Sequence, residues 1–417
     1  MREMKDSGIE WAGVIPNTWN INKGKYFMEL LTRPTLETDE VITCFRDGEV
    51  TLRSKRREEG FTVSLTEAGY QGIEIGDLVV HGMDGFAGSI GISDSRGKAT
   101  PVLNVLDTEQ NKRYMMYLMR TMAYCELFLS LATGIRVRTC DTNWKKLREI
   151  DYILPTIPEQ KAIADFLDEQ CAEIDTLVTD IQSQIEALEE YKRSVITEAV
   201  TKGIDPDVEM RDSGVQWIGD IPAHWITHPL YFYFGVRKNK NALGLETNLL
   251  SLSYGKIIRK DINSNGGLLP ESFNTYNIIE KDDIIIRPTD LQNDKRSLRT
   301  GIAREHGIIT SAYIAMKAIK SVNLEYFHYL LHAYDVMKVF YNMGNGVRQG
   351  LNFSEFSRLM VFEPTIEEQN AIVEYLKEKC DEIDLAIAEK KQQIETIEEY
   401  KKSLIFEYVT GKKEVQA

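Results

Sequence analysis

Two segments of the sequence each occur twice, and the copies lie 206 and 209 residues apart. The first segment, KDSGIEWAGVIPNTW at Lys5–Trp19, returns as RDSGVQWIGDIPAHW at Arg211–Trp225. The second, IPEQKAIADFLDEQCAEID at Ile157–Asp175, returns as IEEQNAIVEYLKEKCDEID at Ile366–Asp384, and the similarity continues to EEYKRSVITEAVT and EEYKKSLIFEYVT. An internal duplication dictates architecture before any single motif does. The chain is therefore built twice on one plan.

Between the repeated blocks, where about half of the aligned positions are identical, the two halves hardly align. Each intervening region has apolar runs broken by Gly, Pro and Asn, which is typical of short strands mixed with helices. A chain of 417 residues is also too long for one ordinary core. We expect a first domain with its N-terminal segment at 1–155, a long helix at 156–202, a linker at 203–225, a second domain at 226–362 and a second long helix at 363–417.

Both predicted helices carry the three-and-four spacing of a coiled-coil seam. The seam of the first helix consists of Leu167, Cys171, Ile174, Val178, Ile181, Ile185, Leu188, Lys192, Val195 and Ala199. The seam of the second consists of Leu376, Cys380, Ile383, Ile387, Lys390, Ile394, Ile397, Lys401, Leu404 and Tyr408. The three lysines on the seam are expected to lower stability and to fix the register, or to mark where a partner packs.

Three arrangements satisfy such a seam: each helix packs on its own domain, the helices pair between two chains, or they pair antiparallel within one chain. We favour the last, because it buries both seams and gives two repeats a pseudo-twofold relation. The predicted fold class is thus α+β, with two α/β-mixed domains separated by two long helices that form an antiparallel coiled coil.

The net charge of −14 is concentrated in a few segments. The predicted helices carry −7 and −6 and the linker carries −4, whereas residues 23–155 carry −1 and residues 226–362 carry +5. The acidity of the whole chain therefore does not argue against a polyanionic partner for the two domains.

No enzyme motif expected of a nucleic-acid protein is present. The sequence contains neither GxxxxGK[ST], NPPY nor HExxH, and its five cysteines have no CxxC spacing. Pro206, Asp207 and Glu209 fit a turn better than a nuclease cluster, and His328 and His332 fit surface or packing roles better than a metal site. The glycine-rich run HGMDGFAGSIG at His81–Gly91 fits tight turns between strands, with direct DNA contact as the alternative. We expect no catalytic and no metal-binding residues.

Taken together, these residues resemble the specificity subunits of type I restriction-modification systems. The resemblance rests on the IPEQKAI and IEEQNAI helix starts, the paired DSG-to-W segments, and the runs EIGDLVVHGMDGFAGSIG and KDDIIIRPTDLQNDKRSLRTG. It implies two target-recognition domains that each dock on one half of a split double-stranded DNA target, with the helices as spacer. It also implies methyltransferase (M) subunits and restriction-translocase (R) subunits as partners. S-adenosylmethionine, ATP and Mg are then expected on those partners and not on this chain.

Direct readout of bases requires side chains that reach base edges while others hold phosphates. Candidates in the first domain are Arg53, Lys55, Arg56, Arg57, Arg136 and Arg138. Candidates in the second domain are Arg287, Asp290, Gln292, Asn293, Lys295, Arg296, Arg299, Arg348 and Gln349.

Two other functions are consistent with parts of the sequence. A coiled-coil scaffold or interaction protein that does not bind DNA would use the same long helices, and a self-contained restriction-methylation enzyme would need the motifs that are missing. The sequence MREMKDSGIEW has no secretory signal, and no stretch approaches the roughly 20 apolar residues of a membrane span. We expect a cytoplasmic protein without membrane contact.

Overall fold

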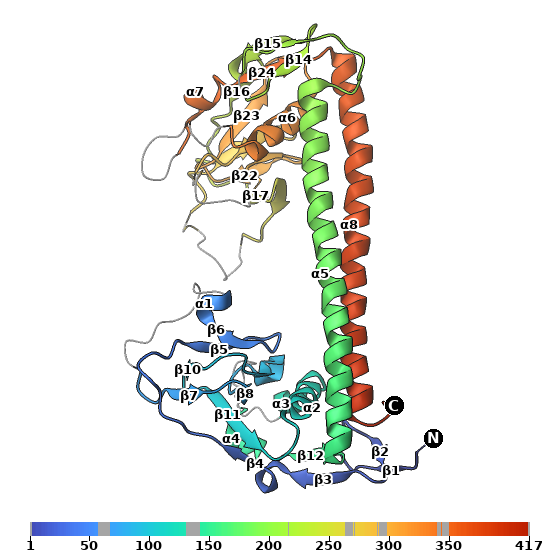
Figure 1. Cartoon of the computed structure of the whole chain (residues 1–417). Coiled ribbons are helices and arrows are strands. Elements are labelled where there is room, and N and C mark those ends of the chain that lie inside the picture. The colour runs from blue at the N-terminus through green and yellow to red at the C-terminus, as the bar shows by residue number, and fades with distance from the viewer. Residues whose placement is uncertain are drawn as a thin grey trace. The chain divides into compact units, whose positions relative to one another are not determined.

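The computed structural model describes residues 2–56, 67–130, 142–215, 217–262, 270, 272–289, 291, 298–339, 343 and 350–415. The chain forms two compact units, one of Met1–Ile181 with Gln392–Ala417 and one of Gln182–Lys391 (Figure 1). Each unit holds one of the two variable regions together with part of both long helices.

In the first unit a four-stranded antiparallel sheet has the order β4-β11-β8-β9. Its strands are β4 (Met28–Leu30), β11 (Leu103–Thr108), β8 (Leu78–His81) and β9 (Ile90–Ile92). The strand pairs around it are β1 (Met4–Asp6) with β2 (Val14–Pro16), β3 (Asn20–Lys23) with β12 (Asp151–Leu154), β5 (Ile42–Cys44) with β6 (Val50–Leu52), and β7 (Gln71–Ile73) with β10 (Gly97–Ala99). The short helical elements are η1 (Gly24–Tyr26), α1 (Arg53–Arg56), η2 (Gly85–Ala87), α2 (Lys112–Tyr124), α3 (Leu127–Ser130) and α4 (Trp144–Leu147).

The second unit repeats this topology strand for strand, although its residues hardly align with those of the first. Its sheet order is β16-β23-β20-β21, formed by β16 (Phe234–Val236), β23 (Ile314–Ala318), β20 (Ile284–Ile286) and β21 (Thr300–Ile302). The strand pairs are β13 (Met210–Asp212) with β14 (Asp220–Pro222), β15 (Ile226–Pro229) with β24 (Met360–Glu363), β17 (Leu250–Ser253) with β18 (Lys256–Arg259), and β19 (Asn277–Ile279) with β22 (Gly307–Ile309). The helical elements are η4 (Leu230–Phe232), α6 (Leu324–Val336) and α7 (Phe353–Phe356).

The two long helices, α5 (Ile157–Lys202) and α8 (Ile366–Val409), run antiparallel within each unit. In the second unit Lys192 bonds to Asp384 at 2.6 Å and Lys390 bonds to Gln184 at 2.5 Å. In the first unit Lys401 bonds to Asp175 at 2.5 Å, and the rings of Phe166 and Tyr408 lie 4.5 Å apart. In each unit the position on α8 falls as the position on α5 rises. The predicted antiparallel pairing is confirmed.

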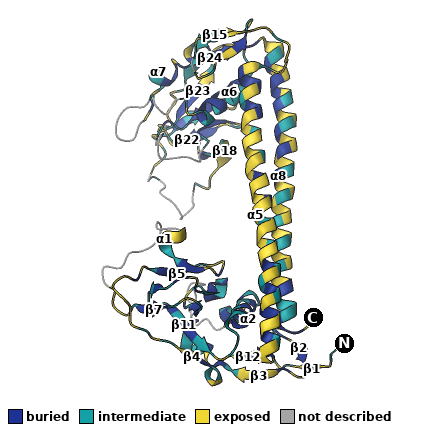
Figure 2. Cartoon of the chain, viewed as in Figure 1, coloured by how far each residue is buried: buried dark blue, intermediate teal, exposed yellow. Residues whose placement is uncertain are grey.

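Each of the three seam lysines therefore reaches an acceptor on the opposite helix. Every other seam position is buried or half-buried, and the exposed positions of both helices appear in yellow in Figure 2. Two of the lysine contacts are surface ion pairs and the third, to Gln184, is a hydrogen bond to an amide. Contacts of this kind contribute about 1 kcal/mol or less, so they add little stability. Their effect is on alignment, because a shifted register would separate each lysine from its acceptor.

The ends of both helices are buried in the cores of the two units. In the first core, the start of α5 contributes Ile163 and Leu167 and the end of α8 contributes Leu404 and Val409. The equivalent residues complete the second core, where the start of α8 contributes Ile372 and Leu376 and the end of α5 contributes Val195 and Val200. Each domain core is thus completed by the beginning of one long helix and the end of the other.

One buried tyrosine in each unit ties the last turn of a long helix to the domain. The hydroxyl of Tyr114 lies 3.0 Å from the carbonyl oxygen of Ile153 and 3.1 Å from that of Val409. The hydroxyl of Tyr326 likewise lies 3.2 Å from the carbonyl oxygens of Phe362 and Val200. Burial raises the pKa of both phenols, so both hydroxyls remain protonated donors.

The two copies of the repeated segment, Lys5–Trp19 and Arg211–Trp225, also contact the ends of the long helices. We call these contacts between domain and helix end the helix joints. Trp19 donates its indole N–H to Glu159 at 3.0 Å, and Trp225 donates to Glu368 at 3.4 Å, so each repeat holds the first turn of a long helix. At the other helix ends, Gly411 and Gly203 adopt left-handed φ values of 69° and 79°. A Cβ on Gly411 would lie 2.5 Å from Pro16, so the repeat leaves no room for a side chain there.

Replacing Tyr114 by Phe should lower the free energy of unfolding of the first unit by about 1–2 kcal/mol, because the two buried carbonyl oxygens lose the single hydroxyl donor that they share. Denaturant unfolding followed by hydrogen exchange separates the two units and should show the loss in the first unit alone. The control is Tyr231→Phe, a change at an exposed residue. An equal loss in the control would show that the buried hydroxyl is not the cause.

Candidate nucleic-acid interface

Three basic candidates of the first domain, Arg53, Lys55 and Arg56, lie on α1, directly after β6. Arg56 bonds to Asp47 at 2.5 Å and to Glu49 at 2.6 Å, and the hydrogen bond with Asp47 raises the pKa of Arg56. Lys55 lies 3.3 Å from Asp94. These cations are therefore held in place by carboxylates of their own domain, so that any contact with phosphates would have to compete with those pairs.

Arg53 is half-buried, and its Nε donates to the hydroxyl of Thr43 at 2.9 Å. Burial lowers the pKa of Arg53. The residue borders a cleft of about 560 Å³ between the β5–β6 hairpin and the loop that follows β8. Arg46, His81, Met83 and Ser89 also line this cleft. Of these cleft residues only Arg53 is one of the basic candidates for DNA contact. His81, Met83 and Ser89 belong to the glycine-rich run, for which DNA contact was the alternative to tight turns.

In the second domain Arg287 directly follows β20 and Arg299 directly precedes β21, and the backbone N–H of Arg287 donates to the carbonyl oxygen of Arg299 at 2.9 Å. Arg287 is half-buried. Arg299 is fully buried, with 0% of its side chain exposed. Its guanidinium donates to the carbonyl oxygen of Thr289 and lies 3.9 Å from the carboxylate of Asp335. The expected DNA contact by Arg299 is therefore corrected, because the structure places this side chain in the interior of the domain.

The remaining candidates fall outside the described residues. One group has equivalent places in the two domains, because residues 136–138 and residues 348–349 both precede the short helix that leads to the last strand of their domain. Arg57 follows α1; Arg136 and Arg138 lie between α3 and α4; and Arg348 and Gln349 lie between α6 and α7. The others lie between β20 and β21, and they are Asp290, Gln292, Asn293, Lys295 and Arg296.

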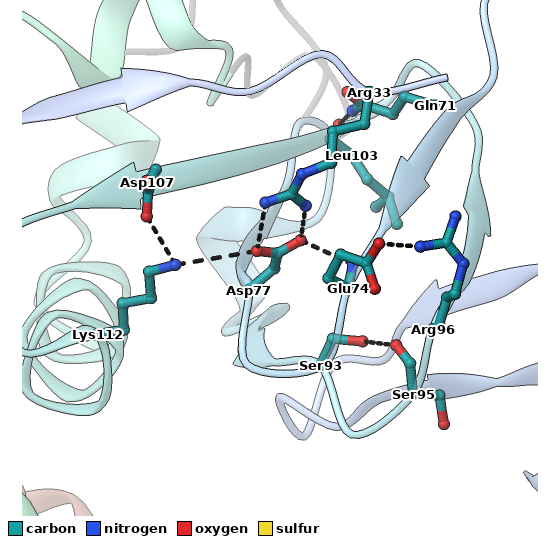
Figure 3. A network of polar contacts seen from close by, with 10 residues as sticks. All are labelled: Arg33, Gln71, Glu74, Asp77, Ser93, Ser95, Arg96, Leu103, Asp107 and Lys112. Carbon is teal, nitrogen blue, oxygen red and sulfur yellow. Dashed lines mark hydrogen bonds and ion pairs between the residues drawn. The ribbon is translucent and has the colours of Figure 1, made fainter. Parts of the chain in front are cut away.

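The runs EIGD at Glu74–Asp77 and KDD at Lys281–Asp283 form the turns that lead into β8 and β20, which are inner strands of the two sheets. Asp77 pairs with Arg33 and accepts the backbone N–H of Glu74 at 2.8 Å (Figure 3). Asp283 pairs with Arg237 at 2.9 Å and accepts the N–H of Glu280 at 2.9 Å.

Burial raises the pKa of Asp283, and the hydrogen bond with Asp77 raises that of Arg33. In Figure 3 the first of these turns is linked on to Lys112 and Asp107, which lie 2.7 Å apart. Each Arg–Asp pair therefore stabilises the turn that leads into an inner strand of its sheet, a role that the sequence runs alone did not indicate.

The paired histidines named from the sequence, His328 and His332, are half-buried on α6. Burial lowers the pKa of His328, and it lowers that of His332 to about 4, so both imidazoles on α6 stay neutral. In the described part of the chain no group of three or more His, Cys, Asp or Glu side chains is placed to hold a metal ion. None of the described helices combines the length and apolar composition that a membrane crossing requires.

Comparisons with known proteins point to one family, although no family model matches the chain. A curated relative from Methanocaldococcus jannaschii is the putative type I restriction enzyme MjaX specificity subunit. It is 26% identical to this chain over 74% of this chain and 71% of its own length. The type I restriction enzyme MjaVIII specificity subunit of the same organism is 26% identical over 73% and 72%. A chain from a structural study of complex assembly and conformational transition of the type I R-M system matches with a TM-score of 0.68 and 10% identity, covering 95% of this chain and 99% of that one.

Replacing Arg299 by Met should destabilise the second unit by about 3–5 kcal/mol, because the buried carboxylate of Asp335 loses its cationic neighbour. Urea unfolding measures this loss, and Lys55→Met, at an exposed position, serves as the control. If Arg299→Met leaves unfolding unchanged but weakens DNA binding, the interior role assigned to Arg299 is wrong.

Proposed function

We propose that this chain, a homologue of the specificity subunits of type I restriction enzymes, binds double-stranded DNA at a split target and gives a restriction-modification complex its sequence specificity. The observation that carries the proposal is the duplicated frame. Two domains share one topology and one set of helix joints, yet they differ in the residues between those joints. A protein that retains its frame and varies its surface is suited to reading two different sequences.

The charge distribution supports the same assignment. The second domain is basic, the first is close to neutral, and the acidity resides in the helices and the linker. In both domains the candidate basic residues lie on or beside the segments that connect strands and short helices. Connecting segments on a rigid scaffold are the usual place for binding residues.

We further propose that the antiparallel helices set the spacing between the two half-sites and provide the surface on which methyltransferase and restriction-translocase subunits assemble. Helices of this length are rigid spacers, and the seam lysines fix their alignment. In this proposal S-adenosylmethionine, ATP and Mg bind to the partner subunits, and this chain contributes recognition without catalysis.

The purified chain alone should therefore neither cleave nor methylate DNA nor hydrolyse ATP. Assays of all three reactions, with and without S-adenosylmethionine, ATP and Mg, test this directly. Methylation should occur only after the partner subunits are added. Turnover that co-purifies with the chain and persists after rigorous purification would contradict the proposal.

The complete system should methylate an asymmetric target in which two different half-sites flank a spacer of fixed length. Inserting four residues between Ile185 and Glu186 in α5, and four between Lys390 and Lys391 in α8, lengthens the pair by about 6 Å. The accepted spacer should then grow by between one and two base pairs, at roughly 3.4 Å each. Genome-wide mapping of methylated sites is the measurement, with the same four residues inserted after Leu243, in an exposed loop, as the control. A palindromic wild-type target, or a spacer that does not respond to the helix insertions, would contradict the proposed architecture.

A further inference from the structure

Strands β8 and β20 occupy the same position in the sheets of the two domains, and so do the residues at their C-terminal ends. His81 is the last residue of β8, and its backbone N–H donates to the carbonyl oxygen of Ser89 at 3.0 Å. Arg287 directly follows β20, and its N–H donates to the carbonyl oxygen of Arg299 at 2.9 Å. His81 in the first domain is thus the structural counterpart of Arg287, a residue that the sequence already suggested for DNA contact.

The ring of His81 is held in one orientation and one protonation state. Its Nδ1 accepts the backbone N–H groups of Met83 at 3.2 Å and Asp84 at 3.0 Å. A nitrogen that accepts two N–H donors carries no proton, so the proton of the neutral ring lies on Nε2. Burial also lowers the pKa of His81, which keeps the ring neutral at physiological pH.

The loop that holds the ring is closely packed. A Cβ on Gly82 would lie 2.8 Å from the carbonyl oxygen of Val102, and one on Gly85 would lie 2.5 Å from the hydroxyl of Thr142. Gly88 has a left-handed φ of 92°. The hydroxyl of Thr142 donates to the carbonyl oxygen of His81 at 2.8 Å. The close packing of the glycine-rich run therefore holds both the backbone and the ring of His81 in place.

The opposite side of the ring has an unused donor. Among the described residues none accepts a hydrogen bond from Nε2–H of His81, whereas the carbonyl oxygen and Nδ1 of the same residue are both engaged. His81 lines the cleft described above together with Ser89, whose fully buried hydroxyl also has no hydrogen-bond partner within the described chain. Arg46 and Met83 at the same cleft are exposed. The cleft thus combines unsatisfied polar groups with an open entrance.

We propose that His81 is a base-reading residue of the first domain, and that it donates its Nε2–H to a hydrogen-bond acceptor on a base edge in the major groove. This inference rests on the proposed function. Guanine offers O6 and N7, adenine offers N7 and thymine offers O4, whereas cytosine presents an amino donor. A fixed neutral donor therefore discriminates among bases at one position. Arg287 reads the second half-site from the equivalent strand end, where its guanidinium is suited to guanine.

Two conservative substitutions separate this role from support of the loop. The side-chain oxygen of Asn in His81→Asn can replace Nδ1 as acceptor, but this residue has no donor at the place of Nε2. The amide N–H of Gln in His81→Gln can replace Nε2–H, but this residue has no acceptor at the place of Nδ1. If His81 reads a base, Asn relaxes the preference at one base pair of the first half-site by roughly three- to tenfold, while Gln retains it. If His81 only supports the loop, the order is reversed.

The measurement is methylation by the assembled complex on a library randomised in both half-sites, with thermal unfolding of each variant recorded in parallel. The second half-site should stay unchanged in both variants, which provides an internal control. His81→Arg is a third, independent variant, because it places the side chain of the equivalent second-domain position in the first domain and should shift the same base pair toward guanine.

Three results would overturn the inference. One is an equal loss of methylation across all first half-sites, which would indicate a phosphate contact. Another is a greater loss of preference in His81→Gln than in His81→Asn, and the third is an unchanged first half-site in all three variants. In each case bipartite methylation by the wild-type complex would leave the proposed function intact, whereas a wild-type complex without a bipartite target would refute that function itself.

Discussion

The burial of both ends of each long helix in domain cores is the constraint on which the structure depends. A single hydroxyl in each unit, from Tyr114 or Tyr326, binds the last turn of one helix to the strand that leads into the other. Neither domain core is complete without residues from both helices. Breaking the helix pair would therefore expose apolar surface in the domains as well as along the seam.

This constraint explains which parts of the chain are repeated. The Trp19 and Trp225 segments, the glycines at the helix ends and the first turns of α5 and α8 all form joints. Their side chains must fit one another, so they remain similar between the halves. The strands between the joints need only a buried apolar face and backbone pairing, which many sequences satisfy. The surface above them is free to differ, as recognition of two sequences would require.

The repeat and the seam spacing were sufficient to predict the antiparallel helices, because helical periodicity is a local signal that survives in a single sequence. The common topology of the two domains could not be found in this way, since strand pairing depends on contacts far apart in the chain. Arg299 shows a related limit. A basic residue near a predicted loop is expected to be exposed, whereas the structure buries Arg299 beside Asp335, a contact that the sequence does not indicate. The sequence includes His81 in the glycine-rich run. That its Nε2–H is the free donor follows only from the structure, in which Nδ1 accepts two backbone N–H groups. Most of the other candidate residues lie outside the described part of the chain, and their role stays a prediction.

The central claim, that one duplicated frame carries two interchangeable readers, is tested most directly by a chain with two copies of the first domain. The segment from Asn20 to Leu154 would replace the segment from Ile226 to Glu363, since these boundaries are the equivalent outer strands β3, β12, β15 and β24. Methylated sites would then be mapped in cells that express the complete system with this chain. The account predicts a palindromic target made of two inverted copies of the first half-site, with the original spacer. Methylation at the original asymmetric target, or at a direct repeat of the first half-site, would contradict it.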